Sequence, residues 1–209
     1  SPPENVLILK TLGGQQALAA VEAGTSSVLV QTPYPLLKEK LAENNYFPQI
    51  EFRTIEARAL LAEACPEPCQ KAERNFDRIL VAIESSAPVG STGMDPLKTD
   101  QLMSLEGMQS LLNRLAPGGW LAVHRFLLPP PRGEMRLLAT VIEALRRQGW
   151  KPGQRLGVFR TLSTLMVLVS REAWTPKESS RFREFCFSRG FAPVYYPDMP
   201  ETERNRVIQ

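Results

Sequence analysis

The stretch 5–16, Asn-Val-Leu-Ile-Leu-Lys-Thr-Leu-Gly-Gly-Gln-Gln, constrains the fold of this chain more than any other. Its apolar run Val6–Leu9 does not alternate with polar residues, which predicts a strand buried on both faces. Gly13 and Gly14 interrupt this run, and helix-forming residues follow at 15–23. A strand, a glycine turn and a helix open the ligand crevice of an open α/β domain, because glycine admits a close ligand and the helix N-terminus offers free N–H groups.

The motif is not a complete dinucleotide fingerprint, because Gln15 and Gln16 stand where further glycines would be expected. A structural turn and a ligand-binding turn therefore both stay open at this point, and the remaining chain must distinguish them.

Strand and helix patterns alternate along the rest of the chain, which predicts an α/β fold. The link Thr161–Thr164 is long enough only for a hairpin, so the strand after it runs antiparallel to its neighbour. We expect seven strands in one mainly parallel sheet with helices on both faces. The expected strands are 6–9, 27–30, 50–55, 78–83, 120–126, 155–160 and 165–170, and the expected helices are 15–23, 35–45, 59–64, 100–115, 134–148 and 175–189.

Composition excludes several classes of protein. A hydrophobic fraction of 43% in 209 residues supports a sizeable core, and a formal net charge of +3 is too small to indicate nucleic-acid binding. The single histidine, His124, excludes metal sites built from several imidazoles, so we expect no metal. Three cysteines indicate a reduced chain with incidental thiols, and a Cys65–Cys69 disulfide is the alternative.

We expect no signal peptide in this chain, and its sequence has no apolar run of transmembrane length. It starts directly at the first strand and ends at Gln209 without a stop signal, which is compatible with a piece of a larger protein. We therefore expect a cytoplasmic protein, or a domain at the cytoplasmic face of a membrane if the chain is an excised piece.

Parallel strand–helix units with a terminal antiparallel hairpin resemble the class I S-adenosylmethionine-dependent methyltransferase fold, a Rossmann-like architecture. Within that fold the chain is most similar to the spermidine synthase (aminopropyltransferase) group. Residues 76–81 and 84–90, Phe-Asp-Arg-Ile-Leu-Val and Glu-Ser-Ser-Ala-Pro-Val-Gly, resemble that family's strand and D-S-S-D-P-x-G loop. Residues 56–58 resemble its acidic-small-Arg element, and residues 115–120 resemble the turn before its fifth strand.

The resemblance implies a role for each matching residue. The implied ligand is S-adenosylmethionine or its decarboxylated form. The residues implied to hold it are Gly13, Gly14, Gln31, Glu56 and Ala57. Glu84 would be the catalytic base, and Ser85, Ser86 and Asp95 would bind the substrate, with Asp95 replacing a missing amine-binding aspartate. The alternatives are a solvated loop carboxylate for Glu84 and a helix N-terminal acid, favoured by the helix dipole, for Glu56.

Several departures from the family pattern fall in one site. Glu84 and Ala87 stand where the family has two aspartates, one the base and the other a ligand of the amine. A cationic amine thus loses one counter-charge. Gln31 stands at the position of the acidic residue that binds the ribose. Its side chain is neutral and holds a hydroxyl less strongly.

Two function classes stay open. The first is a spermidine synthase-like domain that binds a small adenosyl ligand through a degenerate site. The second is an active transferase of methyl or aminopropyl groups. The resemblance is also compatible with a homodimer and with attachment to a membrane domain in a longer parent chain. We expect residues 1–173 to form the spermidine synthase-like domain and residues 174–209 a helical C-terminal extension.

Overall fold

The computed structural model describes residues 3–11, 14–32, 34–35, 39, 47–63, 75–82, 101–127 and 132–204. They form one sheet of eight strands in the order β3-β2-β1-β4-β5-β7-β6-β8. The strands are β1 (Asn5–Leu9), β2 (Ser27–Gln31), β3 (Ile50–Arg53), β4 (Phe76–Val81), β5 (Leu115–Phe126), β6 (Leu156–Arg160), β7 (Thr164–Ser170) and β8 (Ala192–Tyr195). The helices are α1 (Gln15–Glu22), α3 (Ala57–Glu63), α4 (Leu105–Asn113), α5 (Arg132–Arg147) and α6 (Pro176–Ser188), with 3-10 turns η2 (Gln101–Met103), η3 (Pro152–Gln154) and η4 (Glu201–Glu203).

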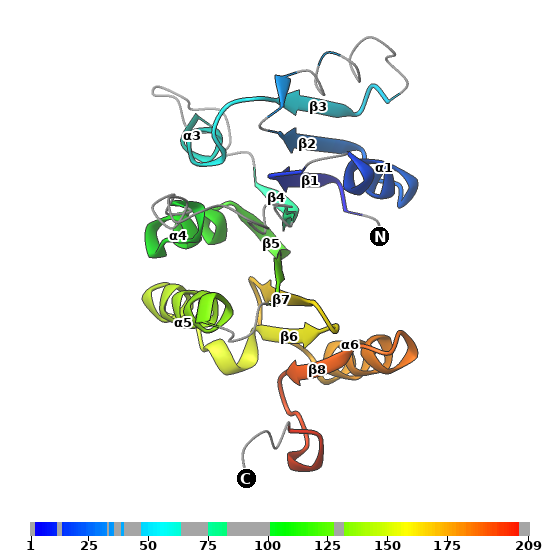
Figure 1. Ribbon diagram of the computed structural model, residues 1–209, viewed down its shortest axis with the longest axis vertical. Helices are drawn as coiled ribbons and strands as arrows, with labels where there is room; N and C mark the ends of the chain where they lie inside the picture. The colour runs from blue at the N-terminus through cyan, green and yellow to red at the C-terminus, as the bar shows by residue number, and fades with distance from the viewer. Residues whose placement is uncertain are drawn as a thin grey trace, which may run out of the picture.

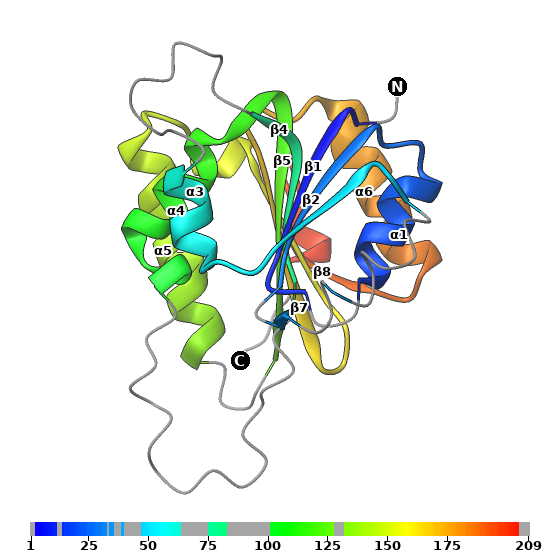
Figure 2. The ribbon, with the colours of Figure 1, turned by 90° about the horizontal axis from the view of Figure 1, so that it is seen from above.

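The sheet lies between two helical layers. Helices α3, α4 and α5 cover one face, and α1 and α6 lie on the other (Figures 1 and 2). Strands β1 to β5 pair in parallel, and β7 lies between β5 and β6, antiparallel to both. The predicted fold class and the antiparallel last strand of the hairpin are therefore confirmed.

The strand count needs one correction, because the sheet has eight strands rather than seven. Strand β8 pairs antiparallel with β6 at the edge of the sheet. The strand, Ala-Pro-Val-Tyr, is short and contains a proline, so its sequence shows no clear strand pattern. The segment expected to form a helical extension thus contributes α6 and also a strand of the main sheet.

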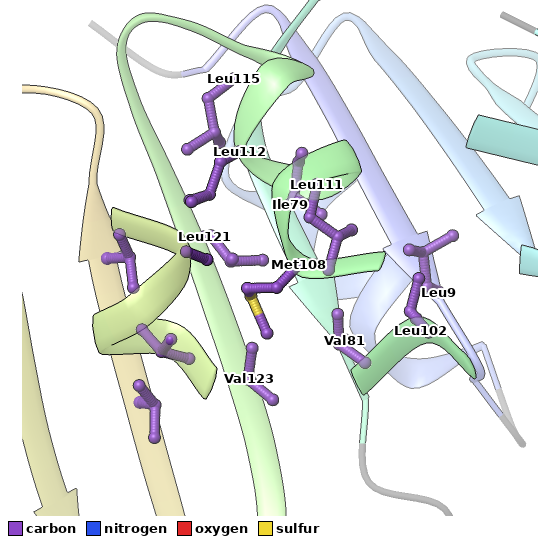
Figure 3. Packing of buried hydrophobic residues seen from close by; sticks show 14 of the residues in the cluster. Leu9, Ile79, Val81, Leu102, Met108, Leu111, Leu112, Leu115, Leu121 and Val123 are labelled. Atoms are coloured by element: carbon purple, nitrogen blue, oxygen red, sulfur yellow. The ribbon is translucent and has the colours of Figure 1, made fainter. Parts of the chain in front are cut away.

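The main core lies under α3, α4 and α5. Alternate residues of the central strands point into it, among them Ile79, Leu121 and Val123, each at most 1% exposed. They pack against the apolar face of α4, in particular Met108, as Figure 3 shows. Both faces of β1 are buried, one on this core and the other on a smaller core beneath α1. This burial matches the unbroken apolar run that predicted the strand.

Two predicted boundaries around α4 are wrong. The helix begins at Leu105 rather than Asp100, because the Ser104 side chain accepts a hydrogen bond from the N–H of Gly107 and caps it there. Strand β5 begins at Leu115 rather than Trp120. Gly118 and Gly119 were expected to form a turn before this strand. They instead lie within β5, at an irregularity where the pairing with β4 shifts register.

Helix α6 begins at the capping box that the sequence predicts. The Thr175 hydroxyl accepts the N–H of Glu178, and the Glu178 carboxylate accepts the N–H of Thr175 at 2.7 Å. Phe182 on its apolar face packs against Phe159 and Trp174 in an aromatic cluster. The free thiol of Cys186 is fully buried there, and burial raises its pKa to about 11, so it remains protonated and unreactive at neutral pH.

Gly157 of β6 leaves room for the indole ring of Trp174, because an added Cβ would overlap that ring. We predict that Gly157→Ala forces Trp174 out of the cluster and lowers the free energy of unfolding by about 1–3 kcal/mol. Urea unfolding followed by tryptophan fluorescence measures this loss. The matched control is Gly133→Ala in the first turn of α5, where nothing lies within 4 Å of the added Cβ. Equal stability of the two variants would contradict the proposed overlap.

Candidate functional site at the carboxyl ends of β1, β2 and β3

The chain reverses its direction of winding between β1 and β4. From β1 it proceeds outward to β2 and β3, and then returns to β4 on the other side of β1. In open parallel sheets, ligands bind at such a switch point, outside the carboxyl ends of the strands. Lys10 and Thr11 follow β1 at this edge, Gln31 ends β2, and Glu56 precedes α3.

Helix α1 begins at this edge of the sheet, at Gly14. Gly14 has φ 72°, a left-handed conformation that favours glycine, and it caps α1 without any side-chain hydrogen bond. The first turn of α1 contains no acidic residue. The helix N-terminus therefore retains N–H groups and a partial positive charge that suit an anionic group of a ligand.

Thr11 connects the end of β1 to the start of α1. Its hydroxyl donates to Oε1 of Gln16 at 2.8 Å and accepts the N–H of Gly14 at 3.4 Å. Lys10 has φ 61°, which is uncommon for a residue other than glycine and marks a backbone held by its surroundings. Sequence reasoning missed Lys10, Thr11 and Gln16, because neither a positive φ at lysine nor a fully buried threonine has a sequence pattern.

Gln31 has both amide atoms bonded to main chain. Its Oε1 accepts the N–H of Lys10 at 2.9 Å, and its Nε2 donates to the carbonyl of Ile55 at 2.9 Å. The side chain is 4% exposed. Gln31 therefore connects the ends of β1 and β3 across β2, and an ionised carboxylate would lose the bond to the Ile55 carbonyl because it has no proton to donate.

The other predicted ligand-binding residues are placed only in part. Glu56 is exposed directly before α3, and Ala57 is buried as its first residue. Gly14, Gln31 and Glu56 thus lie on the segments that end β1, β2 and β3. Gly13, Glu84, Ser85, Ser86 and Asp95 lie outside the described residues.

His124 and Arg125 lie near the end of β5. They are neighbours in a strand, so their side chains point to opposite faces of the sheet. Burial lowers the pKa of the His124 imidazole, which is therefore neutral at pH 7. Among the described residues, no group of three or more His, Cys, Asp or Glu is placed to hold a metal ion.

The class of protein follows from the strand order and the antiparallel β7: the chain has the class I S-adenosylmethionine-dependent methyltransferase fold, with spermidine synthase-like structural relatives. It is similar to human methyltransferase-like protein 13 in complex with SAH, at 14% identity and a TM-score of 0.60, over 87% of this chain and 79% of that one. It is also similar to a probable spermidine synthase from Corynebacterium glutamicum ATCC 13032, at 17% identity and a TM-score of 0.59, over 87% of this chain and 63% of that one.

A third similar structure is a spermidine synthase in complex with the transition-state analogue AdoDATO, at 14% identity and a TM-score of 0.52. The chain covers 61% of that protein's length, so it spans about three fifths of both synthases. No protein-family model and no curated protein sequence matches the chain. Within the described residues, no helix has the length and apolar character needed to cross a membrane.

The hydrogen bonds of Gln31 allow a test of whether this residue stabilises the fold or serves to bind a ligand. We predict that Gln31→Glu destabilises the fold by about 1–3 kcal/mol at pH 7, because a carboxylate faces the Ile55 carbonyl without a proton to donate. The protonated acid can donate, so folding raises the pKa of the introduced carboxyl above its ordinary value. Relative to the parent chain, the stability of the variant is then greatest below about pH 4 and falls as the pH rises through the folded-state pKa of the introduced carboxyl.

Thermal unfolding of the variant and the parent chain between about pH 4 and pH 7 checks this dependence. Gln31→Met serves as the control, because it loses the same hydrogen bonds but cannot titrate. A Gln31→Glu stability difference that does not change with pH would show that the amide is not needed as a donor.

Proposed function

We propose that this chain is a spermidine synthase-like domain that binds S-adenosylmethionine or decarboxylated S-adenosylmethionine, with an active site degenerate for aminopropyl transfer. The observation that carries this proposal is the switch point between β1 and β4, where the uncapped N-terminus of α1 and the ends of β2 and β3 share one edge of the sheet. The adenosyl ligands named for two similar structures, SAH and AdoDATO, support the same class of ligand.

The proposed binding gives a separate role to each residue at this edge of the sheet. Gly13 and Gly14 let the ligand approach the backbone, and the start of α1 receives its carboxylate or, in the decarboxylated form, its polar end. Glu56 accepts hydrogen bonds from the hydroxyls of the ribose or from the adenine amine, beside Ala57. Gln31 maintains the spacing of β1 and β3 and contributes a neutral contact at most, because one hydrogen-bond position of each amide atom is taken by main chain.

Degeneracy is proposed from the amino-acid sequence that follows β4. Glu84 is the one carboxylate at the two places where the resembling family has aspartates, and Ala87 occupies the other. The alternative function is an active transferase in which Glu84 takes the proton, Ser85 and Ser86 bind the substrate, and Asp95 supplies the second carboxylate. Assembly as a homodimer and attachment to a membrane domain of a longer parent chain belong to the proposal on the strength of the family resemblance alone.

Ligand binding is measured directly by calorimetry with S-adenosylmethionine, its decarboxylated form and methylthioadenosine. We predict that the ligand binds more weakly than it would if residue 31 were a carboxylate in contact with the ribose. The difference should be about 1 kcal/mol, or about fivefold in Kd. Glu56→Gln should weaken binding by a further five- to tenfold, because it removes a charged acceptor. The control is Glu22→Gln at the far end of α1, which should bind like the parent chain. No heat from any of these ligands at millimolar concentration would refute the binding site.

Aminopropyl transfer to putrescine should be absent or very slow. The reaction must hold a dicationic amine and remove a proton from one nitrogen, which calls for two carboxylates. Loss of one charged partner costs about 2–4 kcal/mol, equivalent to a rate lower by a factor of about thirty to a thousand.

The assay supplies decarboxylated S-adenosylmethionine and putrescine and follows spermidine and methylthioadenosine. Ala87→Asp should raise the rate, whereas its neutral counterpart Ala87→Asn should not. Rapid turnover by the unmodified chain would refute degeneracy and favour Asp95 as the second carboxylate.

A further inference from the structure

His124 is the only histidine of the chain and lies near the carboxyl end of β5. Its neighbour Val123 is fully buried in the core beneath α4, so His124 faces the side of the sheet on which α1 and α6 lie. The imidazole is half-buried, and it makes no hydrogen bond or ion pair with the residues that the structure describes. Its ring nitrogens are therefore available to a ligand.

The residues nearest to His124 on this face of the sheet are apolar. Met166 of β7 is the residue directly opposite it, and Ala122 and Phe126 lie two positions away in β5. Arg125, the charged residue next to it in the strand, faces the other side. Burial alone lowers the pKa of the imidazole, with no contribution from a charged side chain in the described part of the chain.

The sheet register places His124 two strands away from the end of β1. Val123 pairs with Val81 of β4, and Val81 pairs with Leu9 of β1. Ala82, which follows Val81 beside His124, carries no charge, and its N–H donates to the Leu9 carbonyl at 2.9 Å. Neighbouring strands lie about 4.8 Å apart, so the backbone of His124 is about 10 Å from the end of β1, where the chain turns into α1.

The role of His124 depends on the proposed binding of an adenosyl ligand at this edge. In that binding, Glu56 after β3 contacts the ribose or the adenine, and the start of α1 receives the polar end of the ligand. The sulfur atom, which joins these two parts, then lies near the end of β1 and supplies an activated methyl group. Because β2 and β3 lie on the adenosine side, an acceptor approaches this methyl group from the side of β4 and β5.

We propose that His124 is the proton-accepting group at the acceptor end of this site, and that the acceptor is an apolar molecule with one O–H or N–H nucleophile. The acceptor atom forms its bond to the methyl carbon while the carbon–sulfur bond breaks and its electron pair stays on sulfur. The proton of the acceptor moves to the imidazole, which afterwards releases it to water. A neutral imidazole among apolar side chains suits such an acceptor better than a dicationic amine, which calls for carboxylates.

The position of His124 is tested by NMR of the untagged chain with ¹³C-labelled histidine, which gives a single imidazole signal. The pH dependence of this signal is measured with S-adenosylmethionine bound and with S-adenosylhomocysteine bound, two ligands that differ by one methyl group and the positive charge on sulfur. We expect the imidazole pKa to be lower by about 1 unit with S-adenosylmethionine, because a nearby cation disfavours the imidazolium. The control Arg125→Gln, on the opposite face of the sheet, should keep this difference.

The proton transfer is tested at about pH 8 with two acceptors, phenol and 4-nitrophenol. A phenol hydroxyl with a pKa of about 10 is still protonated there and needs a base, whereas 4-nitrophenol is largely ionised and needs none. Transfer of a tritiated methyl group from S-adenosylmethionine is measured for both. His124→Gln should lower transfer to phenol by about a hundredfold and affect transfer to 4-nitrophenol much less. Circular dichroism and the melting temperature establish that the variant is folded.

Each part of the proposal can be overturned separately from the proposed function. Equal imidazole pKa values with the two ligands, when calorimetry shows that both bind, would refute the position of His124 and leave the binding site intact. No heat from either ligand would refute the binding site itself, and the role of His124 with it.

The acceptor and the base are decided by the transfer assay. No methyl transfer to either phenol would overturn the proposed acceptor. Equal losses with both phenols in His124→Gln would make the role of His124 structural. Loss of transfer to phenol in Glu84→Gln but not in His124→Gln would assign the proton to Glu84 instead.

Discussion

The position of β1, paired in parallel with β2 on one side and β4 on the other, determines most of what this molecule can do. Because β1 is central, both of its faces are buried, on the core beneath α4 and on the one beneath α1. Because the chain leaves β1 in one direction and returns on the other side, the segments that end β1, β2 and β3 meet at a single edge. The position of the candidate site, the start of α1 beside it and the placement of Gln31 all depend on this arrangement.

Gln31 shows how a residue can lie at the expected place and serve a different purpose. A sequence reading treats it as a weakened ribose reader, since the position follows the second strand. The structure uses its amide as a two-sided connector, donating to Ile55 and accepting from Lys10. Only a side chain with both a donor and an acceptor can do this, so stability at this edge favours glutamine where ribose binding would favour a carboxylate.

The order and type of most described elements could be predicted from the sequence, because apolar runs, glycine caps and the Thr175 capping box are local signals. The features that the sequence did not predict depend either on contacts with distant parts of the chain or on a choice between two local signals. Strand β8 is held by its pairing with β6, which no pattern in Ala192–Tyr195 reveals. Ser104 competes with Asp100 as a helix start, and only the observed bond to Gly107 decides between them. The site was predictable as an edge of the sheet, but its hydrogen bonds were not.

The alternation of strand residues does not predict how completely each face of the sheet is covered. The sequence of β4 places Ile79 and Leu80 on opposite faces, but both are large and apolar, so the pattern indicates burial for each. Ile79 is buried by α4, whereas Leu80 and its neighbours Ala122 and Leu168 are only partly buried and line a groove beside α1. Large apolar residues on both faces of a strand therefore indicate that the strand is central, but they do not show which face a helix of the same chain covers.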